Sequence, residues 1–207
     1  MSTRTLAVVH AGLSTPSSTR LLADRLTTAT VAALQARGDA ATVEVVDLRT
    51  HARALADNLV TGFPDGSLRT AVETVSGADG LIAVTPIFSA SYSGLFKTFF
   101  DILDKDALVG TPVLMGATAG SARHSLALEH AMRPLFAYLR AVTVPTGVFA
   151  ASEDWAGGAG ADRALSGHID RAAGELADLV AGRPATTGPV DPFADPTTSF
   201  EELLRGN

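Results

Sequence analysis

Five short apolar runs alternate with segments of helical periodicity, and this alternation constrains the fold more than any other feature of the chain. The runs cover residues 5–11, 41–49, 80–86, 111–118 and 141–149. Strands buried on both faces of a parallel sheet are continuously apolar and rich in β-branched residues, as these runs are. The helical segments cover residues 21–38, 67–78, 94–104, 124–139 and 162–181. Right-handed crossovers between such elements predict an α/β fold: a doubly wound, five-stranded parallel sheet of order 2-1-3-4-5 with helices on both faces.

The alternation stops near residue 181, so residues 1–181 are expected to form a single domain and residues 182–207 a tail. The tail begins with GRPATTGPVDPFADPTTS, whose prolines and glycines cannot continue a packed element. It closes with FEELLRGN, in which Phe200, Leu203 and Leu204 share one face of a helix. Two interpretations stay open: a loose tail, or an arm whose end docks on its own subunit or on a neighbouring one.

Charge and composition exclude several classes of function. The net charge is −6 and no run of Lys or Arg occurs, which argues against a nucleic-acid partner. There is no cysteine, so thiolate metal sites and cysteine nucleophiles are excluded. His124 and His130 are six residues apart, which on a regular helix places them on different faces, and no metal site is expected. No apolar run approaches the roughly 20 residues of a membrane span, and the N-terminus leads directly into a strand. A cytoplasmic protein without membrane contact is therefore expected.

The loop after the first predicted strand is rich in hydroxyl groups. It contains neither G-x-G-x-x-G nor G-x-x-x-x-G-K-[ST], so no dinucleotide or NTP fingerprint is present. Hydroxyl groups beside the unpaired N–H groups of a helix N-terminus suit a phosphate monoester, and an arginine adds positive charge. The alternative is that one of these residues only caps the helix. The candidate phosphate ligands are Ser14, Ser17, Ser18, Thr19 and Arg20.

Two further loops are expected at the same edge of the sheet. In a sheet of this order, ligands bind at the switch point between strands one and three, outside the carboxyl ends of the strands. The segment 86–93 (PIFSASYS) follows strand three, and the segment 118–121 (TAGS) follows strand four. The small residues of the latter allow backbone N–H groups to approach the edge of a ring. A phosphate site, a planar slot and a polar edge together match the shape of FMN.

Residues 5 to about 155 resemble the NAD(P)H-dependent FMN reductases of two-component, alkanesulfonate-type monooxygenase systems. The resemblance is most specific over P-x-[YF]-x-x-S-Y-S-G-x-x-K and the D-[IL]-L that follows, here PIFSASYSGLFK and DIL. It implies a flavodoxin-like fold. The Tyr common two residues after the proline is Phe88 in this chain. The flavin-contacting positions that the resemblance implies are Pro86, Ile87, Phe88, Ser91, Tyr92 and Ser93, with Thr118, Ala119, Gly120 and Ser121 along the pyrimidine edge.

The function implied is hydride transfer from NAD(P)H to FMN, which supplies reduced flavin to a partner flavin-dependent monooxygenase. No catalytic side chain is assigned, because hydride passes directly between the two cofactors. Arg123 or Arg20 is a candidate to meet a phosphate of the nicotinamide cofactor. Three alternatives remain: an electron carrier of flavodoxin type, a quinone or azo reductase with tightly bound FMN, and a flavin-free structural protein on the same fold.

The helix expected at 94–104 is apolar nearly all round, which favours a subunit interface and hence a homodimer or homotetramer. Leu95, Phe99 and Ile102 are the residues expected to lack a partner within the chain. Pro134 lies inside the next helical pattern and removes one backbone hydrogen bond. It predicts an irregular helix around His130, with the imidazole directed at a neighbouring subunit.

Overall fold

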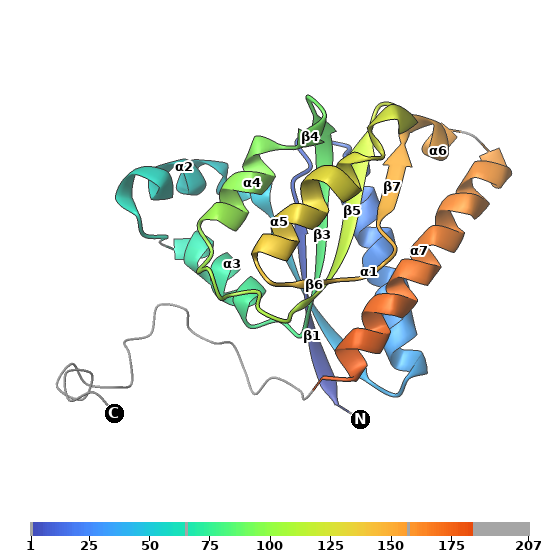
Figure 1. Ribbon diagram of the computed structural model, residues 1–207, viewed down its shortest axis with the longest axis horizontal. Coiled ribbons are helices and arrows are strands. Elements are labelled where there is room, and N and C mark those ends of the chain that lie inside the picture. Colours follow the sequence, from blue (N-terminus) through green and yellow to red (C-terminus); the bar gives the residue numbers. More distant parts are fainter. Residues whose placement is uncertain (1, 65, 157, 184–207) are drawn as a thin grey trace.

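The computed structural model describes residues 2–64, 66–156 and 158–183, and these residues form a layered α/β structure around one twisted sheet (Figure 1). The parallel ladder runs in the order β2 (Ala40–Asp47), β1 (Thr3–His10), β3 (Gly80–Phe88), β5 (Pro112–Ala119) and β6 (Val142–Thr143). In addition, β7 (Val148–Ala151) pairs with β5, and the short β4 (Ser91–Tyr92) pairs antiparallel with β3. The predicted flavodoxin-like strand order is therefore confirmed.

The last predicted strand is divided in two. In place of one strand over 141–149, the chain forms β6 and then β7, which ends at Ala151, and these pair in turn with the first and second halves of β5. Pro145 lies between them and has no N–H to donate to the ladder. The amide N–H of Thr146 donates to the carboxylate of Glu175 at 2.8 Å, and its hydroxyl donates to the same carboxylate at 2.7 Å. The chain consequently leaves β5 at this point and rejoins it at Val148.

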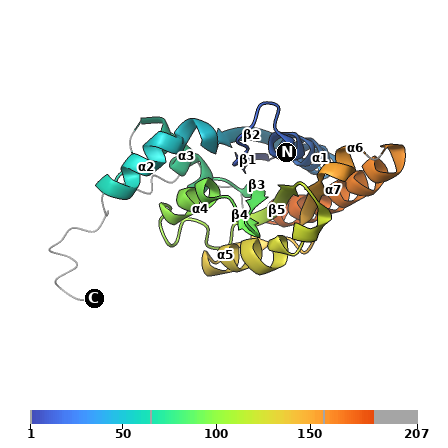
Figure 2. The ribbon, with the colours of Figure 1, turned by 90° about the horizontal axis from the view of Figure 1, so that it is seen from above.

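Helices cover both faces of the sheet (Figure 2). On the first face, α1 (Ser18–Ala36) and α7 (Gly158–Ala181) pack side by side over Leu6, Val8, Ile82 and Val84. The second face is covered by α3 (Gly66–Ser76), α4 (Gly94–Asp101) and α5 (Arg133–Tyr138). The strands are buried on both faces, as their continuous apolar runs predict.

Three helical elements connect to this framework. A 3₁₀ turn over Leu48–His51 leads into α2 (Ala52–Thr61), which the sequence analysis did not predict. Helix α2 ends at Gly62, whose φ of 81° is the left-handed conformation that glycine adopts readily. The short α6 (Ser152–Ala156) follows β7. Within the described residues, no helix combines the length and the apolarity needed to cross a bilayer.

The predicted helix 124–139 is irregular, as Pro134 indicates. It consists of a 3₁₀ turn over Ala122–His124, a π-helical turn over Leu128–Met132 and the α-helix α5. The π turn contains His130, so the predicted irregularity around this residue is confirmed. The predicted tail lies outside the described residues except for its first two positions, 182 and 183.

Candidate functional site

Three loops meet at the carboxyl edge of the sheet, which is the upper edge in Figure 1. The register brings the strand ends together, because His10 pairs with Val84 and Pro86 pairs with Thr118. The hydroxyl groups of Thr19 and Thr118 form a buried hydrogen bond of 2.8 Å. This bond joins the first turn of α1 to the third loop, although the two residues are 99 positions apart. The predicted convergence of the first and third loops is thus a direct contact.

The hydroxyl groups in and next to the first loop have different partners in the structure. The Ser17 side chain caps α1, and its oxygen accepts a hydrogen bond of 3.2 Å from the Arg20 amide. Thr19 is only 3% exposed, and its hydroxyl is engaged with Thr118. Ser14 and Ser18 are exposed. Of the predicted phosphate ligands, Ser14 and Ser18 therefore have accessible hydroxyl groups, while Ser17 and Thr19 shape the loop.

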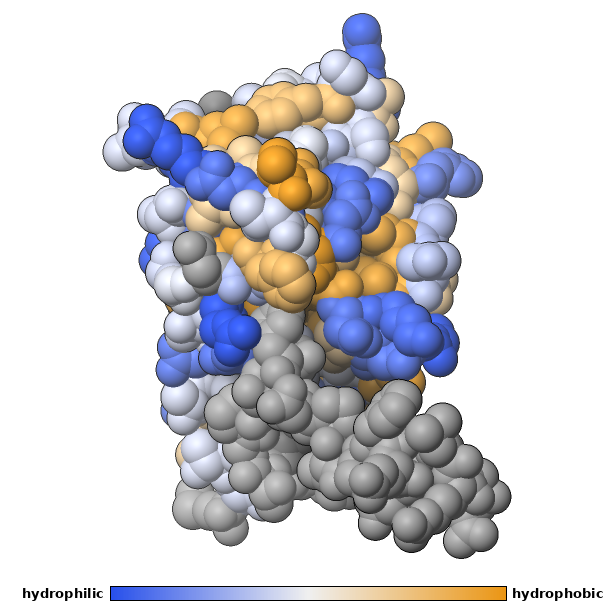
Figure 3. Space-filling model, turned by 90° about the vertical axis from the view of Figure 1, so that its left-hand side faces the viewer, coloured by the Kyte–Doolittle hydropathy of each residue, from blue (hydrophilic) through white to orange (hydrophobic). Residues whose placement is uncertain are grey.

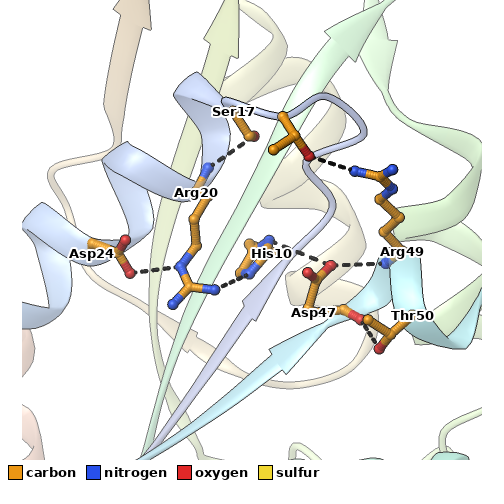
Figure 4. Close-up of polar contacts among 8 residues, drawn as sticks. His10, Ser17, Arg20, Asp24, Asp47, Arg49 and Thr50 are labelled. Atoms are coloured by element: carbon orange, nitrogen blue, oxygen red, sulfur yellow. Dashed lines mark hydrogen bonds and ion pairs between the residues drawn. The ribbon is translucent and has the colours of Figure 1, made fainter.

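A cavity of about 380 Å³ lies beneath this loop and carries groups of both charges (Figure 4). The guanidinium of Arg20 pairs with Asp24 at 2.8 Å. The guanidinium of Arg49 donates to the hydroxyl of Thr15 at 2.9 Å, and this hydroxyl carries no charge to balance that of the arginine. The lining residues are His10, Gly12, Ser14, Thr15, Pro16, Ser17, Arg20, Leu21, Asp24, Asp47 and Arg49.

His10 is the most enclosed polar group of this cavity. It is 2% exposed; its Nε2 lies 3.4 Å from an Arg20 nitrogen, and its Nδ1 has no hydrogen-bond partner. Burial lowers the pKa of His10, and the nearby carboxylate of Asp47 opposes that shift only in part. The imidazole of His10 thus lies between the guanidinium of Arg20 and the carboxylate of Asp47, whose oxygen is 3.9 Å from Nδ1. The two guanidinium groups and the exposed loop hydroxyls are the groups of this cavity that suit a phosphate ester, which accepts several hydrogen bonds at once.

Three residues of this cavity were not predicted from the sequence as site residues: His10, Asp47 and Arg49. The available signal was their position at the carboxyl ends of the first two strands, the edge at which ligands bind in sheets of this kind. Their pairing depends on register, since His10 is opposite Asp47 across β1 and β2.

The second loop is a tight hairpin. Ile87 pairs with Tyr92 and Phe88 with Ser91, and the two residues between them, Ser89 and Ala90, have positive φ values of 49° and 67°. Such a turn reverses the chain within two residues, and positive φ at non-glycine residues is a strained conformation found at functional sites. The parallel ladder of β3 ends at Pro86, as predicted, but the strand itself continues to Phe88 through its antiparallel pairing with β4.

The predicted flavin-contacting residues of the hairpin differ in their exposure to solvent. Phe88 is 51% exposed, and Ser91 and Tyr92 are half-buried. Ser93 is 2% exposed, and its hydroxyl caps α4 by accepting from the Phe96 amide at 3.2 Å. Pro86 and Ile87 are also buried. A ligand at this edge therefore meets Phe88 first, whereas Ser91 and Tyr92 line a groove that runs towards α4 and α5.

The third loop presents backbone rather than side chains. Thr118 is buried, Ala119 and Ser121 are half-buried, and Gly120 is exposed. A Cβ added at Gly120 would meet nothing within 4 Å, so the space over this peptide is open. Backbone N–H groups beside an open space can donate to the polar edge of a ring.

Several known proteins are similar to this chain. The sequence profile of the NADPH-dependent FMN reductase family matches residues 4–156. An FMN reductase (NADPH) of Pseudomonas aeruginosa is 37% identical over 139 residues, which cover 67% of this chain and 75% of that protein. An NADH-dependent FMN reductase, SfnE of Pseudomonas putida, is 40% identical over 129 residues, 62% of this chain and 69% of that protein.

Solved structures agree with this match. An oxidoreductase of Corynebacterium diphtheriae superposes with a TM-score of 0.83 at 52% identity, covering 87% of this chain and 98% of that one. The apo form of the NADH:FMN oxidoreductase EmoB superposes with a TM-score of 0.74 at 26% identity, covering 90% of this chain and 95% of that one. The span that matches the family profile contains all three loops and the sheet edge on which they converge, and the chain accordingly belongs to the NADPH-dependent FMN reductase family.

Proposed function

We propose that this FMN reductase holds FMN across its three loops, receives hydride from NAD(P)H there and supplies the reduced flavin to a flavin-dependent monooxygenase. The observation that carries the placement of FMN is the Thr19–Thr118 hydrogen bond, which fixes the hydroxyl-rich loop against the loop with the open backbone. The link to a monooxygenase rests on the sequence resemblance, and a cytoplasmic location accords with the use of NAD(P)H.

Each loop has its own task in this proposal. The first loop and the N-terminus of α1 hold the phosphate through Ser14, Ser18 and N–H groups, with charge from Arg49 and Arg20. The flavin, when bound, supplies the hydride-accepting ring. Phe88 forms a wall of the planar slot. Backbone N–H groups at 119–121 stabilise negative charge at the pyrimidine edge.

The first prediction concerns the phosphate. We expect FMN to bind about tenfold or more tightly than riboflavin, because charge-assisted hydrogen bonds to a phosphate contribute about 1.5–3 kcal/mol. Fluorescence titration of both flavins measures this ratio. Equal affinities would contradict the placement of the phosphate in the first loop.

A second assay tests the reaction itself. Oxidation of NADPH and NADH with added FMN, with and without a quinone, distinguishes an FMN reductase from a quinone reductase and from an electron carrier.

We also propose that the protein is a homodimer or homotetramer, but the predicted contact residues need correction. Phe99 is fully buried in the core of its own chain, and Leu95 and Ile102 are half-buried against the same core. These residues therefore have partners within the chain.

The surface beside α4 still favours self-association. A groove of about 660 Å³ runs between α4 and the π turn with α5, and Tyr138 at its margin is 81% exposed. Helix α2, which packs against α4, exposes Leu59 and Val60. Figure 3 shows apolar residues gathered on this side of the molecule between hydrophilic ones. Exposed apolar surface of this kind is typical of protein interfaces.

The second prediction tests this surface. Tyr138→Asp is expected to shift the protein towards monomer, because it places a charge in the contact. Sedimentation velocity at micromolar concentration measures the distribution, with Arg171→Asp on α7 as the matched control. A wild-type protein that sediments as a monomer would rule out the oligomer.

A further inference from the structure

A second, smaller cleft lies at the same edge of the sheet as the three loops. Its volume is about 190 Å³. Ala90, at the turn of the flavin-site hairpin, forms one wall, and Arg123, two residues after the third loop, forms another. The lining residues are Ala90, Arg123, His124, Leu126, Ala127, His130 and Ala131.

The irregular helix brings the basic residues of this cleft together. On a regular α-helix His124 and His130 would lie on different faces, as the sequence analysis expected, but both line the cleft. His124 ends a 3₁₀ turn, and His130 lies in the π turn. A tight turn followed by a wide turn changes the angle between the two side chains from that of a regular helix. The expectation of separate faces was therefore wrong, although the described residues contain no group of three ligands for a metal ion.

Two of the three basic residues of this cleft form no ion pair with the described residues. Arg123 and His124 have no acidic partner among the described residues. The carboxylate of Glu129, in the adjacent π turn, accepts from the guanidinium of Arg133 at 2.6 and 2.8 Å. That hydrogen bonding lowers the pKa of Glu129, and the neighbouring His130 lowers it further, so Glu129 interacts with Arg133 and His130. An unpaired guanidinium in a chain of net charge −6 favours an anionic ligand.

We propose that this cleft binds a phosphate group of the nicotinamide cofactor, with Arg123 as its charged ligand. The inference rests on the proposed placement of FMN, because the nicotinamide must stack on the flavin ring between the second and third loops. The remainder of the cofactor then leaves the slot past Ala90 and Arg123. The planar fork of a guanidinium matches two phosphate oxygens, and the imidazole N–H groups of His124 and His130 add donors.

Two phosphate groups share this chemistry. The diphosphate bridge is common to NADH and NADPH, whereas the 2′-phosphate occurs only in NADPH. Arg123→Ala distinguishes them, because loss of contact with the bridge raises KM for both cofactors and loss of contact with the 2′-phosphate raises it for NADPH alone. In either case we expect a rise of about tenfold or more, as for a lost charge-assisted hydrogen bond, with little change in kcat.

A binding measurement that does not depend on turnover completes the test. Calorimetry with adenosine 2′,5′-bisphosphate and with ADP probes the 2′-phosphate and the diphosphate separately. The fragment that contains the bound phosphate is expected to lose affinity in Arg123→Ala. Arg171→Ala, at an exposed position on α7, removes the same charge and is expected to match the wild type.

The possible outcomes are distinct. If Arg123→Ala binds FMN normally but retains its KM for both cofactors and its affinity for both fragments to within about twofold, the phosphate site is refuted. If the wild type itself fails to bind FMN, the placement of the flavin fails instead. The FMN titration of the wild type separates these two failures.

Discussion

Replacing Phe100 with alanine is expected to lower the free energy of unfolding by about 3–5 kcal/mol, the usual cost of removing a buried phenyl group. Phe100 is 2% exposed. Its ring centroid lies 4.7 Å from that of Phe96, 5.1 Å from that of Phe136 and 5.5 Å from that of Phe99. The contacts with Phe136 and Phe99 are edge-to-face, a favourable arrangement for aromatic rings. The substitution therefore removes both apolar burial and specific ring contacts.

Urea denaturation monitored by circular dichroism measures this loss. Phe88→Ala is the matched control, because it deletes the same atoms from a residue that is 51% exposed. We expect Phe88→Ala to change stability by no more than about 0.5 kcal/mol, as surface substitutions usually do. A loss below about 1 kcal/mol for Phe100→Ala would contradict the packing of this cluster.

The aromatic cluster also shows how far periodicity determines the environment of a helix. The spacing of Phe96, Phe99, Phe100 and Leu103 predicts an apolar stripe, and the structure buries all four residues. Periodicity does not tell which element covers a face. The unpredicted α2 and the 3₁₀ turn before it pack against α4, so a face that suggested a subunit contact is partly covered within the chain.

The positions of the loops follow from topology, whereas the tasks of individual hydroxyl groups do not. Parallel strands of this order place the loops after β1, β3 and β5 at one edge, and this was predictable from the alternation of elements. Thr19 and Ser14 have the same chemistry in the sequence. Only the packing of α1 against β5 engages the Thr19 hydroxyl with Thr118. Sequence reasoning could not separate the residue that shapes the loop from the one that faces a ligand.

The sequence predicts where the helix is irregular, but not how the irregularity directs the side chains. Pro134 removes the hydrogen bond to the carbonyl four residues earlier, which belongs to His130, and the π turn contains that residue. The sequence does not indicate how many residues enter the widened turn. The number of residues in that turn determines the direction of each side chain, and hence the meeting of His124 and His130 in one cleft.

Gly12→Ala is expected to weaken FMN binding by about tenfold or more, to the level of riboflavin, through loss of the phosphate contacts. Gly12 is buried beneath the first loop. A Cβ at this position would lie 2.2 Å from the Ser17 oxygen, 3.2 Å from the Ser17 Cβ and 3.4 Å from the Thr19 Cβ. Ser17 must therefore move, which removes the cap of α1 at a cost of about 1 kcal/mol and shifts the loop that holds the phosphate.

Two comparisons make this expectation specific to the phosphate. Gly167→Ala adds the same methyl group on α7, where it would meet nothing within 4 Å, and it is expected to leave FMN affinity unchanged. The double variant Gly12→Ala with Ser17→Gly removes the colliding side chain and is expected to recover part of the affinity, since glycine is itself an acceptable cap.

Riboflavin provides the sharper distinction, because it lacks the phosphate. Its affinity is expected to be the same in Gly12→Ala as in the wild type, since the ring slot between the second and third loops is untouched. If Gly12→Ala weakened both flavins equally, the damage would extend beyond the phosphate loop. If it weakened neither, binding of the phosphate would not depend on the loop that contains Ser17. If Gly12→Ala lowers the affinity for FMN but not for riboflavin, the close packing of Gly12 against Ser17 is required for binding of the phosphate.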